Sequence, residues 1–160
     1  MKTMTATLFR IAAATLPSLL LLAGCATDRH PPFPVQRYVP VSRAMLPLGE
    51  LHLSNTEMSL AALEGAMQLQ YVGLLPETAG NDLVGASVYR VKNSGKYFKQ
   101  NTGKDAYCAE TPRWVVVNSK TGAPAWSKEI WVGLLTLEDW SKVTPDAHYC
   151  AAGGYVRSAD

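Results

Sequence analysis

Histidines and carboxylates are the residues of this 160-residue chain that could act as catalytic acids or bases. The three histidines, His30, His52 and His148, lie far apart, and none is spaced from a serine, cysteine or aspartate as in a hydrolase motif. Glu138 and Asp139 are adjacent, so on a strand their side chains would point to opposite faces. The sequence contains no G-x-S-x-G elbow and no phosphate-binding glycine loop. We therefore expect a protein that is not an enzyme, with a hydrolase assembled from distant residues as the alternative.

A basic segment, residues 92–104, is the best candidate for contact with a partner. Its 13 residues hold four of the eight lysines of the chain and two neighbouring aromatic residues. Such cations could bind an anionic partner, namely lipid phosphates, a cell-wall polymer or an acidic protein, and the aromatic rings among them could stack on sugar rings. The alternative is a solvated hairpin whose lysines protect an exposed edge strand. The candidate binding residues are Lys92, Lys96, Tyr97, Phe98, Lys99 and Lys104.

Four tryptophans form a second group between residues 114 and 140. Trp114 and Trp131 lie inside apolar stretches, which predicts core positions for both. Trp126 and Trp140 flank predicted strand ends. A ligand groove lined by these rings is the alternative to packing.

The N-terminal 28 residues have the features of a bacterial export signal. Lys2 and Arg10 precede an apolar run of 13 residues, 11–23. A helix that spans a bilayer needs about 20 residues, whereas the apolar part of a secretory signal has about 7–15. The run ends in LAGC (22–25), which resembles the lipobox of bacterial lipoproteins, L-[AS]-[GA]-C. The resemblance implies cleavage before Cys25, a diacylglycerol on its thiol and an acyl chain on its new amino group.

The lipobox also implies a location. In the sorting rule of such lipoproteins, aspartate after the cysteine favours the inner membrane, so Ala26 implies the outer membrane, with the periplasmic side favoured over the cell surface. The alternatives are an ordinary cleaved signal with a chance cysteine, or an uncleaved anchor. Cleavage would leave 13 basic and 13 acidic residues. This balance argues against a nucleic-acid-binding protein, which usually has a strong basic excess.

Cys108 and Cys150 remain as a pair if Cys25 is lipidated. Because disulfides persist outside the cytoplasm, we expect these two cysteines to be bonded. The closed loop of about 42 residues would stabilise the fold by about 4 kcal/mol. The alternative is a metal site formed by Asp146, His148 and Cys150, but this stretch lacks the paired ligand spacing of a structural zinc site. We expect no metal and no cofactor other than the covalent lipid on Cys25.

The chain is predicted to divide into a signal peptide (1–24), a lipidated cysteine with a proline-rich tether (25–47) and one disulfide-linked domain (48–160). The tether holds five of the ten prolines, counted from residue 26 to residue 47. Ser54 followed by Glu57 resembles a capping box and predicts a short helix over 55–64, with a hairpin turning at 64–65 as the alternative. Alternation of apolar and polar residues predicts strands around 51–53, 67–75, 83–91, 114–118, 130–137 and 155–156.

Regular strands with short turns predict a mainly β fold, a small antiparallel β-barrel or sandwich with one short helix near residues 55–64. The adjacent valines at 115–117 predict a central strand covered on both faces. We expect a lipid-anchored cell-envelope lipoprotein that acts as a non-catalytic binding or accessory protein facing the periplasm. Its partners would be membrane lipid, through the anchor, and an anionic envelope component or protein. The alternatives are a carrier of a small apolar or lipid ligand inside a barrel, or an envelope hydrolase.

Overall fold

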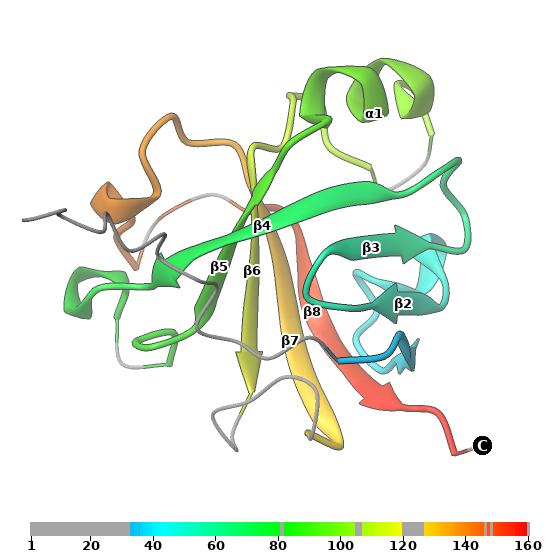
Figure 1. The fold of residues 1–160 in the computed structure, drawn as a ribbon, viewed down its shortest axis with the longest axis horizontal. Helices are drawn as coiled ribbons and strands as arrows, with labels where there is room; N and C mark the ends of the chain where they lie inside the picture. The colour runs from blue at the N-terminus through cyan, green and yellow to red at the C-terminus, as the bar shows by residue number, and fades with distance from the viewer. Residues whose placement is uncertain are drawn as a thin grey trace, which may run out of the picture.

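A closed barrel of antiparallel strands forms the body of the protein in the computed structural model (Figure 1). The structure describes residues 33–159, apart from 81, 105–106, 120–126, 146 and 148. Each strand pairs with the next along the chain, and β8 pairs with β1 to close the barrel. The strands are β1 Gln36–Pro40, β2 Leu51–Leu53, β3 Glu57–Leu60, β4 Met67–Leu74, β5 Ser87–Val91, β6 Trp114–Ser119, β7 Glu129–Leu135 and β8 Tyr149–Arg157. The barrel predicted as one of two β architectures is therefore confirmed.

The strands are built on two-residue alternation, as the sequence predicts for most of them. In β4, Met67 and Leu69 are buried inside while Gln68 and Gln70 are exposed. Because successive side chains of a strand point to opposite faces, this pattern orients the whole strand in the barrel wall.

The helix predicted over 55–64 is wrong. The Ser54 hydroxyl does accept hydrogen bonds from the backbone N–H groups of Thr56 (3.3 Å) and Glu57 (3.0 Å), as a helix cap would. Here those bonds close the turn between β2 and β3. Met58 and Leu60 in β3 then alternate with exposed or half-exposed neighbours and face the interior. The alternative hairpin is the observed structure, because a cap and a tight turn use the same local hydrogen bond.

Among the described residues, the α-helix is α1 Ser94–Asn101, which lies in the basic segment and at one end of the barrel (Figure 1). The buried Asn101 side chain accepts a hydrogen bond from the Glu64 N–H (2.8 Å) and donates to the carbonyls of Glu64 and Tyr97. Asn93 likewise accepts from the Gln68 N–H at 2.9 Å. Two asparagine side chains thus fasten α1 to the β3–β4 hairpin. The solvated hairpin considered for this segment is therefore not formed, and a helix that depends on tertiary contacts takes its place.

The barrel begins earlier than the predicted domain boundary at residue 48. Strand β1 lies within the segment predicted as tether, and Tyr38 on it is fully buried. Val39 and Pro40 pair with residues of β8, so the barrel cannot close without this strand. The prolines of this segment favoured the prediction of a tether, although the side chains of β1 alternate between buried and exposed. Cys25 and residues 26–32 lie outside the described residues.

The interior of the barrel is filled by large side chains. Its core includes Tyr38, Tyr89 and Tyr155 together with methionines and leucines from β2–β4, all nearly inaccessible to solvent. Cys108 belongs to this core and forms the predicted disulfide with Cys150 of β8, with 4.9 Å between the Cα atoms. In the described part of the chain, no helix is long and apolar enough to cross a membrane.

A second apolar cluster, here called the outer cluster, lies on the outside of β5–β7. The β4–β5 connection, with the short 3-10 helix η2 Glu77–Ala79, covers one side of it, and the β7–β8 connection, with η4 Trp140–Lys142, covers the other. Another short 3-10 helix, η1 Leu46–Leu48, follows β1. Covered strands with apolar residues on both faces are thereby confirmed. The fully buried members are Leu75, Ala79, Ala86, Val88, Val116, Leu135 and Val143.

Candidate binding surface

The predicted binding residues of the basic segment do not form one surface. Tyr97 points into the barrel end and is only 2% exposed, and burial raises the pKa of its hydroxyl to about 12. Phe98 is half-buried, with its ring 6.1 Å from that of Tyr107. Tyr97 and Phe98 therefore attach α1 to the barrel, since packing occupies their rings.

The lysines of the basic segment are also divided. Lys104 forms an ion pair with Glu64 (3.1 Å), and this contact lowers the pKa of the Glu64 carboxyl. Lys96 and Lys99 are exposed on α1. Lys92 follows β5 and lines a groove together with cations from outside the segment. Of the predicted set, only Lys92 therefore reaches this groove.

This groove, here called the basic groove, is a hollow of about 700 Å³ on the outer wall of the barrel. Its floor is a row of paired residues on three neighbouring strands: Gln70 of β4 is opposite Arg90 of β5, which is opposite Trp114 of β6. In paired strands such opposite side chains stand on the same face, close together. An amide, a guanidinium and an indole thus come from positions 70, 90 and 114.

The walls of the basic groove add two cations and one acid. Lys92 and the first turn of α1, Ser94 and Gly95, form one wall. Arg113 and Glu138 also line the groove, with 3.5 Å between their charged atoms. Both of these side chains are more than half exposed, so this ion pair is weak. The groove therefore carries three cations against one carboxylate.

Arg90 and Lys92 have no ion pair or side-chain hydrogen bond among the residues that the structure describes. The Trp114 indole N–H donates to the Leu137 carbonyl (2.8 Å), which holds the ring in a defined orientation. Backbone hydrogen bonds of 2.8–2.9 Å also hold Lys92 against Gln68, and Arg113 against β5 and β7. The cations are thus presented from rigid backbone.

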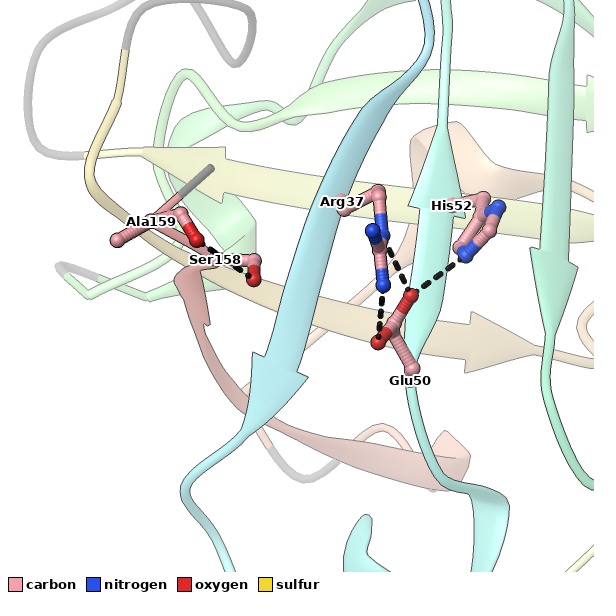
Figure 2. Close-up of polar contacts among 5 residues, drawn as sticks. All are labelled: Arg37, Glu50, His52, Ser158 and Ala159. Atoms are coloured by element: carbon pink, nitrogen blue, oxygen red, sulfur yellow. Dashed lines mark hydrogen bonds and ion pairs between the residues drawn. The ribbon is translucent and has the colours of Figure 1, made fainter.

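A second charged cluster, on β1 and β2, has a different balance. Figure 2 shows the side chains of Arg37 and His52 converging on the Glu50 carboxylate, at 2.9 and 2.7 Å. These hydrogen bonds, from Arg37 first and from His52, lower the pKa of Glu50 to about 2. His52 is exposed on the outer face, as its place in the strand pattern suggests. The charges of this cluster satisfy one another, which leaves the basic groove as the stronger site for a partner.

The interior offers neutral hydroxyls rather than charged groups. The hydroxyls of Tyr97, Tyr107 and Tyr155 are buried without a hydrogen-bond partner in the described part of the chain. Burial raises the pKa of each of them, so all three remain neutral at physiological pH. Such groups pack and do not supply acid–base chemistry near pH 7.

Most of the basic groove had no signal in the sequence. Trp114 is predicted in the core by its apolar neighbours, whereas the indole lies half-buried on the outer wall. Arg90 lies two residues before Lys92, just outside the basic segment, and only the pairing of β5 with the β6 side of the sheet brings Arg113 beside them. The register of β4, β5 and β6 was the missing information.

The remaining predicted site residues are the three cysteines and the ligands of the alternative metal site. Cys108 and Cys150 are bonded to each other. Cys25 lies outside the described residues, as do Asp146 and His148 of the alternative metal site. Among the residues described, no group of three or more histidine, cysteine or acidic side chains could hold a metal ion.

The fold and site define a class: an antiparallel eight-stranded β-barrel with a filled interior, one disulfide and a basic groove on its outer wall. No family model, no curated protein and no solved structure matches this chain.

Proposed function

We propose that this protein is a lipid-anchored, non-catalytic binding protein of the cell envelope, and that it binds its partner on the outer wall of the barrel. The resemblance of residues 22–25 to a lipobox supports the anchor, and Ala26 supports the outer membrane over the inner membrane. We place the domain on the periplasmic side. The formal charge balance after Cys25 makes general attraction to nucleic acid a poor explanation, so recognition would depend on local charge.

The observation that carries this proposal is the filled interior. A barrel that transports an apolar ligand needs a cavity, as the small ligand-holding barrels have. Here the space is taken by tyrosine, methionine and leucine side chains with 0–1% exposure, among them Tyr38, Tyr155 and Met58. Since interior packing favours binding on the outside, the carrier function becomes the weaker alternative.

The anchor is tested by replacing the lipidated residue. The wild-type chain, expressed in a bacterium fed an alkyne-tagged fatty acid, should become labelled and fractionate with the outer membrane. Cys25→Ser should be unlabelled and should keep its signal peptide, because the lipoprotein peptidase requires the modified cysteine. Wild-type protein that is processed normally but carries no lipid would refute the anchor.

The binding function is tested by mass spectrometry of the purified full chain. A carrier would retain an apolar molecule after extraction from membranes, in addition to the covalent lipid. The proposal predicts an empty barrel, together with envelope partners that can be cross-linked to residues of the outer wall. A stoichiometric apolar ligand released by solvent extraction would support the carrier instead.

A further inference from the structure

We infer that the basic groove binds an acidic saccharide, meaning one or two sugar rings that carry a carboxylate or a phosphate. This inference rests on the proposed function in placing the binding surface on the outer wall, and it adds the chemical class of the ligand. It follows from four properties of the groove: its size, its unpaired cations, its aromatic floor and its rigid backbone.

The size and shape of the groove suit a small ligand. Its volume of about 700 Å³ falls within the range of roughly 300–1,000 Å³ that ligand pockets occupy. Walls from α1 on one side and from Glu138 on the other make it concave. A disaccharide would fit such a hollow, whereas a flat contact with a folded protein would leave it unfilled.

The cations of the groove repel one another when no ligand is bound. Arg90 and Lys92 are two residues apart, so they stand on the same face of β5 and its extension. Arg113 lies beside them, and its contact with Glu138 is long (3.5 Å) and exposed. An oxyanion placed among the three cations would relieve this repulsion and accept charge-assisted hydrogen bonds, among them the paired bonds of a guanidinium.

Trp114 and Gln70 give the site its preference for a sugar over a bare anion. The indole of Trp114 lines the groove next to Arg90, and an aromatic ring offers a face on which the C–H side of a sugar can stack. The amide of Gln70, opposite Arg90 on its other side, can both donate to and accept from sugar hydroxyls.

The groove is also preorganised. The Val91 N–H donates to the Arg113 carbonyl and the Arg113 N–H donates to the Leu135 carbonyl, both at 2.9 Å. Binding therefore does not have to order the backbone that carries the cations, which saves free energy of association.

The test is calorimetric titration of the full chain in detergent with four ligands at low salt. Digalacturonate and glucose 6-phosphate carry the two forms of oxyanion, maltose is the neutral disaccharide, and inorganic phosphate is the anion without a ring. We expect at least one acidic sugar to bind about ten-fold or more tightly than both maltose and inorganic phosphate. The comparison of the two acidic sugars assigns the oxyanion as a carboxylate or a phosphate.

Two variants locate the site. Arg90→Gln should weaken binding of the acidic sugar about ten-fold or more, since it removes an unpaired guanidinium from the floor. Lys99→Gln removes an exposed cation of α1 that does not line the groove, so it should change the affinity less than about two-fold. Both positions are exposed, and matching unfolding midpoints would show that both variants fold.

Several results would overturn the inference. Equal affinity for maltose would remove the role of charge, and equal affinity for inorganic phosphate would remove the role of the sugar. Equal losses in the two variants would show general attraction rather than a site. A lipid-labelled protein that cross-links to envelope partners but binds neither acidic sugar at millimolar concentration would refute this inference and leave the proposed function standing.

Discussion

The two faces of β5, β6 and β7 are both apolar, but they are closed in different ways. Inside, Val115 and Val117 pack among tyrosines and leucines in a space that the barrel itself encloses. Outside, Val88 and Val116 are covered by two chain connections, and this cover ends at the basic groove. The inner face therefore contributes to the stability of the fold and is not accessible to a partner. The outer face combines a smaller core with the surface that remains for a partner.

Loss of the disulfide should destabilise the inner side of the barrel as much as any change proposed here, because Cys108 belongs to the interior and Cys150 to the closing strand β8. Replacing both cysteines with alanine should lower the free energy of unfolding by about 4 kcal/mol for the loop of 42 residues. Denaturant unfolding measures this loss. A loss well under 1 kcal/mol would contradict this expectation and would mean that packing of the interior stabilises the barrel around Cys108 and Cys150 without the disulfide.

Matched leucines compare the two faces directly. Leu51 is fully buried inside, and Leu75, with 3% exposure, belongs to the outer cluster. We expect Leu51→Ala to cost about 4 kcal/mol and Leu75→Ala about 2 kcal/mol, because connecting segments can move into the space better than a closed barrel can. Denaturant titrations of the two variants measure the difference. Equal losses would show that the outer cluster is as rigid as the interior.

Gly133 of β7 tests how tightly the outer face is covered. A Cβ atom at this position would meet the Trp131 ring at 2.5 Å and the Tyr149 ring at 2.6 Å, and these rings pack edge to face above the glycine. Gly133→Ala should therefore cost about 1–3 kcal/mol by forcing the rings apart. Gly95→Ala is the control, since no atom lies within 4 Å of its added Cβ apart from its chain neighbours and the nearby backbone of α1 itself. In thermal unfolding, the melting temperature of Gly95→Ala should equal that of the wild type or be slightly higher.

The Arg37–Glu50–His52 cluster should have the smallest effect, since exposed ion pairs contribute little. The pKa of Glu50 is lowered from 4.5 to about 2, so the stability that this carboxylate adds is present above pH 4.5 and is lost as the pH falls towards 2. Glu50→Gln should lack this part of the pH dependence. Melting temperatures of both proteins between pH 2 and pH 6 measure it, and parallel curves would contradict the expectation.

Sequence patterns predicted the strands whose two-residue alternation is strong, such as β4. They failed where one local signal fits two structures. The Ser54 side chain makes the same bonds in a cap and in a turn, and the prolines around β1 concealed the alternation of Gln36 and Tyr38. Helix α1 has little apolar periodicity of its own and depends on Asn93 and Asn101, which bond to residues of another hairpin.

The sequence by itself determined the β class, most of the strands and the pairing of Cys108 with Cys150, because alternation and cysteine number are local or countable properties. It also contains the stretch LAGC (22–25), whose resemblance to a lipobox is the basis of the proposed anchor. Only the tertiary structure decided that the barrel closes through β1 and that its interior is full. It also decided that Arg113 shares a groove with Arg90 and Lys92, because this proximity follows from the register between strands and not from the order of the residues in the chain.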